Sequence, residues 1–133
     1  MPTFEVEKER IYIFELEEDY RFKHYFDRED IFSELQDHYN GEGYRFEVPK
    51  DEFPDVEDLL NENYFEPVIV DDPSEFGVVK EAYTEHADIL RNSVMHWSRD
   101  DHNFFLMKDP KAVDQAVEQG ASRISETEFV LGL

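Results

Sequence analysis

The stretch RIYIFELEEDYRFKHYF (residues 10–26) most constrains the fold, because it contains two consecutive segments with the two-residue period of a β-strand. The side chains that alternate are Ile11, Ile13 and, less regularly, Leu16 in the first segment, and Tyr20, Phe22 and His24 in the second. The acidic residues between the segments are a candidate turn. The stretch therefore predicts two strands joined by a tight connection.

Helix signals follow this stretch. Asp27 is a candidate N-cap with acidic residues in the next turn, and Asn40-Gly41 is a stop signal, so we expect a helix between them. Its predicted apolar face contains Ile31, Phe32, Leu35 and Tyr39. A second helix is expected to begin at Pro54, with Val56, Leu59, Leu60 and Tyr64 facing inward.

The second half contains two further helix signals. We expect the longest helix within residues 75–98, because one set of side chains recurs with the helical period: Val79, Tyr83, His86, Leu90, Ser93 and Trp97. Asp109-Pro110 combines an N-cap with proline at the first helical position, and Gly120 provides a stop.

Four more runs predict strands: residues 44–49, 67–73, 104–107 and 127–131. The run at 67–73 is short and continuously apolar, which is typical of a strand buried on both faces. The final third has strand–helix–strand order, compatible with one right-handed crossover. Together these signals predict an α+β fold, with a mixed, largely antiparallel sheet and helices packed mainly on one face.

Length and composition predict one folded domain spanning residues 1–133. The chain has 40% hydrophobic residues, including 12 Phe and 7 Tyr, and no internal repeat or linker. It has no cysteine, which excludes disulfides and thiolate ligands. The first residues carry charges where a signal peptide needs an apolar run, and no apolar stretch is long enough for a membrane span. We therefore expect a soluble cytoplasmic protein.

The charge is extreme: 34 Asp and Glu against 13 Lys and Arg give a net charge of −21. This charge disfavours nucleic acid and anionic membranes as direct partners. The favoured explanation is adaptation to molar salt, where repulsion between surface charges is screened within about 3 Å. Alternatively, the protein imitates nucleic acid, or it binds one basic partner as an immunity-type protein does.

The stretch HWSRDDHNFF (96–105) gathers the most reactive side chains. We expect a helix end, a polar turn and a strand there. His96, Asp101 and His102 are candidate catalytic residues, and Arg99 and Asp100 are candidate binding residues. The five histidines show none of the spacings typical of metal sites, so we expect no metal, and no sequence motif predicts a cofactor.

Basic and aromatic residues alternate in YRFKHYF (20–26), the best basic patch of the chain. Tyr20, Phe22 and Lys23 are therefore further binding candidates, although an ordinary half-buried strand explains the same alternation. A row of acidic residues at 55, 58 and 62 would suit a charge mimic, but acidic helices commonly carry such rows.

We thus expect a salt-adapted, non-catalytic domain that binds a protein partner through exposed aromatic residues. The first alternative is an inhibitor that acts by charge, either a nucleic-acid mimic or an immunity-type protein, on a basic partner. The second is a small metal-dependent or acid–base enzyme that uses the turn at residues 96–102. The sequence predicts no particular oligomeric state.

Overall fold

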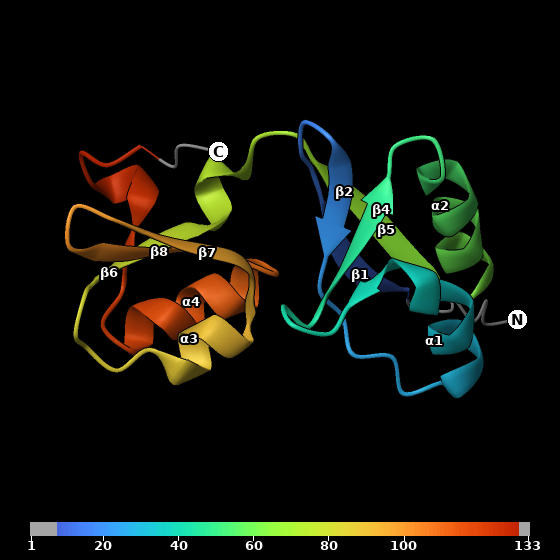
Figure 1. The fold of residues 1–133 in the computed structure, drawn as a ribbon, viewed down its shortest axis with the longest axis horizontal. Coiled ribbons are helices and arrows are strands. Elements are labelled where there is room, and N and C mark those ends of the chain that lie inside the picture. Colours follow the sequence, from blue (N-terminus) through green and yellow to red (C-terminus); the bar gives the residue numbers. More distant parts are fainter. Residues whose placement is uncertain (1–7, 131–133) are drawn as a thin grey trace, which may run out of the picture.

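The computed structural model describes residues 8–130 and arranges them as two β-sheets with four α-helices (Figure 1). The elements of the first half are β1 (Glu9–Glu15), β2 (Asp19–Phe22), α1 (Glu29–Leu35), β3 (Tyr39–Asn40), β4 (Arg45–Pro49), α2 (Phe53–Glu62) and β5 (Phe65–Val70). Those of the second half are β6 (Gly77–Glu81), α3 (Ala87–Arg91), β7 (Ser93–Arg99), β8 (His102–Met107), α4 (Pro110–Glu118) and β9 (Ser122–Arg123). Short 3-10 turns lie at Gln36–His38, Pro73–Phe76 and Ile124–Glu126.

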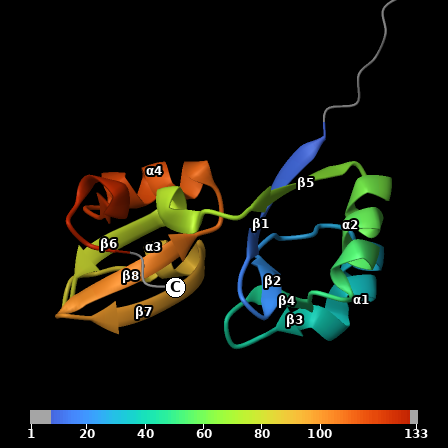
Figure 2. The same cartoon turned by 90° about the horizontal axis from the view of Figure 1, so that it is seen from above.

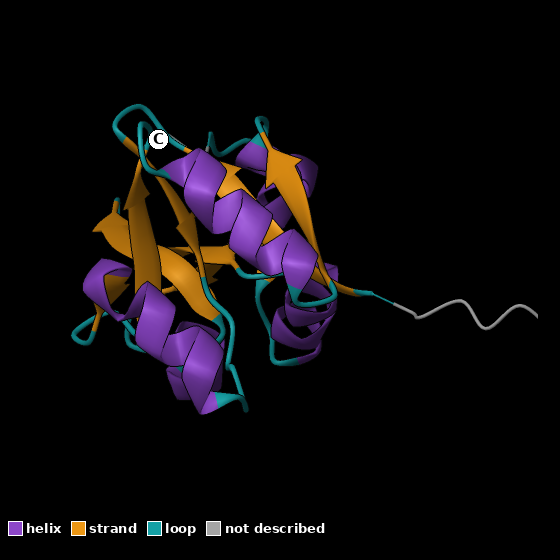
Figure 3. Cartoon of the chain, turned by 90° about the vertical axis from the view of Figure 1, so that its right-hand side faces the viewer, coloured by secondary structure: helices purple, strands orange, loops and turns teal. Residues whose placement is uncertain are grey.

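The first sheet has the strand order β3-β4-β2-β1-β5, in which only the β1–β5 pair is parallel. Strand alternation divides the side chains of β1 between two environments. Ile11 and Ile13 are buried with residues of α1 and α2, whereas Phe14 is buried on the opposite face. Figure 3, viewed from the side of α1 and α2, shows these helices in front of the sheet.

The second sheet has the order β7-β8-β6-β9 and its neighbouring strands are all antiparallel. On one face, Val78, Phe105 and Met107 pack with buried residues of α3 and α4. On the other face, Val79, Phe104 and Leu106 pack with Phe14 and Val70 of the first sheet. This inter-sheet core couples the two halves, which Figure 2 shows side by side and joined by the segment between β5 and β6.

Several predictions from local signals are confirmed. The chain is α+β, its sheets are mostly antiparallel, and each sheet has its helices on one face. The hairpin β1–β2, the strands β4 and β8 and the helix α2 lie where the sequence predicts them. The Asp109 carboxylate caps α4 by accepting a hydrogen bond from the Ala112 amide (2.7 Å), and Gly120 ends that helix region with φ of 99°. No helix of residues 8–130 has the length and apolar composition needed to cross a bilayer.

The predicted long helix within residues 75–98 is wrong. Only Ala87–Arg91 is α-helical there, and the strands β6 and β7 flank it. β6 is covered on both faces, with Val78 and Val79 in different core clusters, so its apolar residues run continuously and the helical period arises by coincidence. Trp97 therefore lies on a strand, where its ring stacks on Phe104 (centroids 5.9 Å apart).

The helix end expected at the start of residues 96–105 is also wrong, because these residues belong to the hairpin β7–β8; the polar turn and the strand after it are confirmed. The turn consists of Asp100 and Asp101, which both adopt the left-handed backbone conformation, with φ of 53° and 59°. Two successive left-handed residues are what a two-residue hairpin turn needs, and aspartate tolerates that conformation better than most residues.

Four smaller predictions need correction. The first helix begins at Glu29, with Arg28 rather than Asp27 at the N-cap, and ends at Leu35. Tyr64 does not face inward but is 58% exposed. β5 is an edge strand with Ile69 38% exposed, so it is not covered on both faces. Residues 127–130 form no strand, and 131 lies outside the described residues; the edge next to β6 is taken by β9 instead.

Candidate ligand-binding cleft

The structure does not bring the two candidate histidines of the hairpin together. His96 pairs with Phe105 across β7–β8, and their rings stack with centroids 6.3 Å apart. The ring of His102 instead packs against that of Phe129, with centroids 4.9 Å apart, next to the inter-sheet core. Since Phe105 belongs to the core on the α3–α4 face, the two imidazoles point to opposite faces of the hairpin. Within residues 8–130, no three His, Asp or Glu side chains are placed to hold a metal ion.

The other candidates in this hairpin have structural contacts. Arg99 donates a hydrogen bond to the Val130 carbonyl (2.7 Å), and its guanidinium lies 4.6 Å from the centre of the Phe104 ring. Asp101 accepts a hydrogen bond from the Ala82 amide through its backbone carbonyl (2.9 Å). Asp100 accepts one at its carbonyl from His102 Nδ1 (2.7 Å) when that nitrogen carries the proton. These contacts hold the turn against neighbouring loops.

Only one of the three candidates in residues 20–26 faces an open site. The Tyr20 ring stacks on Phe53 with centroids 3.9 Å apart, and Phe22 is fully buried in the core under α1 and α2. Lys23, by contrast, points into a cleft between the first sheet and the segment α3–β7. The alternation predicted in residues 20–26 thus places Tyr20 and Phe22 against the core and Lys23 in the cleft.

This cleft has a volume of about 730 Å³. Its walls come from the segment that follows β2, the turn between β3 and β4, α3 and the start of β7. Lys108 adds to them from the connection between β8 and α4. Figure 1 shows the β3–β4 turn extending from the first sheet toward the second half. Both halves of the chain therefore contribute to the cleft.

The lining of the cleft is mainly basic, whereas the chain as a whole is strongly acidic. Four of the 13 Lys and Arg residues line it, namely Lys23, Arg45, Arg91 and Lys108. Glu42 is the one described carboxylate in its lining, although the chain contains 34 Asp and Glu. Arg91 Nη1 lies 3.8 Å from Asp88 Oδ1, outside the lining. No described carboxylate comes within salt-bridge distance of Lys23 or Lys108.

Two of these cations lie in the first half of the chain and donate hydrogen bonds to backbone carbonyls of the second half. Lys23 Nζ donates to the Arg91 carbonyl (2.8 Å), and Arg45 Nη1 donates to the Val94 carbonyl (3.2 Å). Neither contact uses all the donors of its cation: an ammonium has three N–H groups and a guanidinium has five. Both side chains therefore keep N–H groups with which they can bind a ligand in the cleft.

Burial and neighbouring positive charges lower the pKa values of several groups in the cleft. Burial, followed by the charges of Lys108 and Arg45, lowers the pKa of Lys23 to about 8. Burial and the charge of Arg45 also lower the pKa of His96, and burial lowers that of His24. These shifts oppose protonation of the free site, and an anion placed in the cleft would reverse them.

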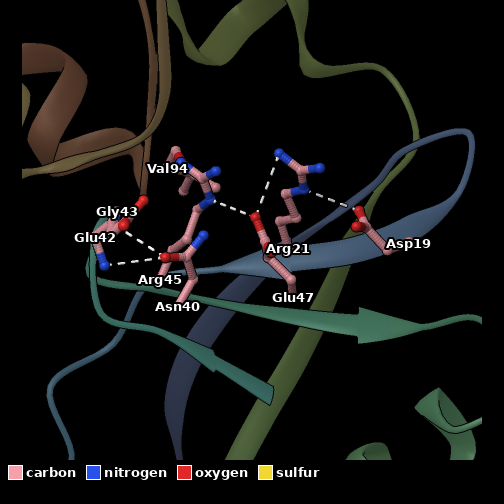
Figure 4. A network of polar contacts seen from close by, with 8 residues as sticks. All are labelled: Asp19, Arg21, Asn40, Glu42, Gly43, Arg45, Glu47 and Val94. Atoms are coloured by element: carbon pink, nitrogen blue, oxygen red, sulfur yellow. Dashed lines mark hydrogen bonds and ion pairs between the residues drawn. The ribbon is translucent and has the colours of Figure 1, made fainter. Parts of the chain in front are cut away.

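A polar network holds Arg45 in place (Figure 4). Arg45 Nε lies 2.8 Å from Glu47 Oε1, which Arg21 approaches to 3.6 Å, and Arg21 Nε lies 2.9 Å from Asp19 Oδ1. Burial alone would raise the pKa of Glu47, but the hydrogen bond from Arg45 and the charges of both arginines outweigh it and lower that pKa. The network keeps Glu47 ionised and fixes the guanidinium of Arg45 at the cleft.

Apolar side chains supply the rest of the lining. Leu90 and Met95 are partly buried there, and Tyr25 and Tyr44 stand at the rim with 87% and 67% of their surface exposed. Tyr44 has φ of 51°, a strained conformation for an aromatic residue. The turn beneath it is ordered by Asn40 Oδ1, which accepts hydrogen bonds from the Glu42 and Gly43 amides (3.0 and 3.3 Å).

Sequence reasoning found Lys23 but missed Arg45, Arg91 and Lys108, which are far apart in the chain and meet only in the fold. A comparison with protein-family models, curated proteins and solved structures finds no significant match.

Proposed function

We propose that the protein is a non-catalytic binding module that holds an anionic ligand in the cleft between its two halves. One observation carries this proposal: four cations and a single described carboxylate line the cavity of a chain with a net charge of −21. Grouping like charges in a partly buried site opposes folding, so such a group is expected where a ligand of opposite charge binds.

Contacts within the cleft favour binding over catalysis. The Ser93 hydroxyl donates to the Leu90 carbonyl (2.7 Å), and the His96 ring stacks on Phe105. Neither side chain is hydrogen-bonded to a partner that would activate a nucleophile. The second alternative, an enzyme that uses the turn at residues 96–102, has no support of this kind, since its two candidate histidines face opposite sides of the hairpin.

A second observation favours the alternative of a basic partner. A groove of about 390 Å³ between α1 and α2 is lined by five carboxylates, Glu34, Glu52, Asp55, Asp58 and Glu62. It contains the acidic row that the sequence predicted on α2. We propose this groove as the contact for a basic protein; charge-neutral variants of α2 should then weaken that complex most at low salt.

The proposed cleft is tested with an anionic aromatic probe, 8-anilinonaphthalene-1-sulfonate, whose fluorescence rises in apolar surroundings. Lys108→Glu should weaken probe binding about ten-fold or more, because it removes a charge-assisted contact and adds repulsion. Lys111→Glu is the matched control, since Lys111 is exposed on α4 outside the cleft lining. Circular dichroism establishes that both variants are folded. Equal affinities of the two variants would contradict the proposal.

A further inference from the structure

Three of the four cations in the cleft lining, Lys23, Arg45 and Lys108, are anchored to the backbone of residues 91–94. Lys23 Nζ donates a hydrogen bond to the Arg91 carbonyl (2.8 Å) and Arg45 Nη1 donates one to the Val94 carbonyl (3.2 Å). The Lys108 amide donates to the Asn92 carbonyl between them (3.0 Å). Lys23 and Arg45 come from the first half and Lys108 from the second. An oxyanion among the three would neutralise repulsion that the free protein carries, and it would bridge the two halves. The positive charges of the three groups therefore suit the anionic head group of a ligand.

An apolar surface lies within the same cavity. Leu90 and Met95 line its wall from α3 and β7, and the aromatic rings of Tyr25 and Tyr44 border it. Tyr44 lines the cavity although its backbone adopts the left-handed conformation. Such strain persists where the surrounding structure or a function requires that placement. A ligand that uses the whole cavity thus needs an apolar or aromatic body next to its charged head.

The size of the cavity fits a small molecule. Its volume of about 730 Å³ falls within the range of about 300–1,000 Å³ that is typical of small-molecule sites. It is much larger than a lone phosphate or carboxylate requires. Inorganic phosphate would occupy only the part of the cavity next to these cations and leave the apolar surface uncovered.

An acidic peptide fits the same cleft less well. β7 is an edge strand, and a peptide could extend the sheet only by pairing with its free backbone groups. Where β7 faces the cleft, however, Arg45 already donates to the Val94 carbonyl, and Lys23 donates to the carbonyl of Arg91 just before the strand. A peptide with many carboxylates is also repelled by the remaining surface of a chain with net charge −21.

We infer that the ligand of the cleft is a compact organic anion, a phosphate or carboxylate attached to an aromatic body. The head binds the free N–H groups of Lys23, Arg45 and Lys108, and the aromatic body packs against Tyr44 and Met95. This inference rests on the proposed binding function and specifies the ligand class.

The test is an NMR titration of the full chain, uniformly labelled with ¹⁵N and held at one pH and one KCl concentration at which it is folded. Four probes are compared: phenyl phosphate, phenylacetate, inorganic phosphate and hexaglutamate. Phenyl phosphate is expected to shift the amide signals around Lys23, Arg45 and Lys108, and to bind about ten-fold more tightly than inorganic phosphate because its ring is buried. The ratio between phenyl phosphate and phenylacetate identifies the preferred head group.

Two variants separate the aromatic contact from the charge. Tyr44→Gly relieves the backbone strain and removes the ring, so it should weaken phenyl phosphate binding about three- to ten-fold and leave inorganic phosphate unchanged. Tyr83→Gly is the matched control: Tyr83 has φ of 69°, is 99% exposed and does not line the cleft. It should change neither affinity.

The outcomes distinguish the ligand class from the binding function itself. Phenyl phosphate binding no more tightly than inorganic phosphate, or hexaglutamate binding in the cleft more tightly than both aromatic probes, would overturn the inference and leave the binding module intact. If none of the four probes shifts a cleft signal, the inference and the proposed function both fail.

Discussion

The affinity of the cleft for an aromatic carboxylate should fall about ten-fold between pH 7 and pH 9, because Lys23 loses its proton in this interval. In the free protein, burial and the charges of Lys108 and Arg45 lower the pKa of this ammonium to about 8. A bound carboxylate favours the protonated form and raises that pKa. The affinity is therefore greatest below pH 8, and it decreases as the pH rises through the pKa that Lys23 has in the free protein.

The magnitude follows from the populations. With a pKa of about 8, about 90% of free Lys23 is protonated at pH 7 and about 10% at pH 9. If only the protonated form binds, the apparent dissociation constant rises by the ratio of these populations. The other groups that face the site are Glu42, Arg45, Arg91, Lys108, the tyrosines at 25, 39 and 44, and two histidines. Burial lowers the pKa of His24 and of His96 below the ordinary value, which favours the neutral form of both rings across this interval.

Isothermal titration calorimetry with phenylacetate at pH 7, 8 and 9 measures this effect, because the carboxylate of the probe stays ionised across the interval. Lys23→Arg is the control: a guanidinium remains charged, so its affinity should be nearly independent of pH. A wild-type affinity that is the same at pH 7 and pH 9, or an equally steep decrease in Lys23→Arg, would refute the assignment of Lys23 to the anion site.

Three further predictions concern the fold and its salt dependence. Raising KCl from 0.1 M to about 2 M should raise the melting temperature, since screening relieves repulsion in a chain of net charge −21; equal melting temperatures would contradict salt adaptation. Phe104→Ala should lower the free energy of unfolding by about 3–5 kcal/mol in urea titrations, because Phe104 is fully buried between the sheets; a change near zero would contradict that packing. Replacing Asp101 should give the stability order Gly, Asp, Val, with Val lower than Asp by about 1–2 kcal/mol, because φ at this position is 59°.

Local signals in the sequence were sufficient for the elements that local chemistry determines. Asp109 and Pro110 predicted the start of α4 because an N-cap and a fixed φ act on the adjacent turn. Alternation predicted β1 because the buried Ile11 and Ile13 alternate with Arg10 and Tyr12, which are exposed and half-buried. The same reasoning failed for β6, where both faces are covered and periodicity carries little information.

The hairpin at residues 93–107 has a turn signal in the sequence. Asp100-Asp101 separates two segments that pair across β7 and β8, and two aspartates can supply the left-handed turn. Trp97 also fits the helical period of the apolar residues before it, and this period predicts the helix within residues 75–98 instead of a strand. The cleft had no comparable signal, because Lys23, Arg45 and Lys108 meet only through the packing of the two halves.

The most direct test of the anion-binding cleft is a crystal structure of the protein with phenyl phosphate, from a lattice that leaves the cleft open. We expect the phosphate within hydrogen-bond distance of Lys23 Nζ and the Arg45 guanidinium, and the ring against Tyr44. A structure at saturating ligand in which phenyl phosphate occupies another surface, while the cleft contains only solvent, would contradict the account.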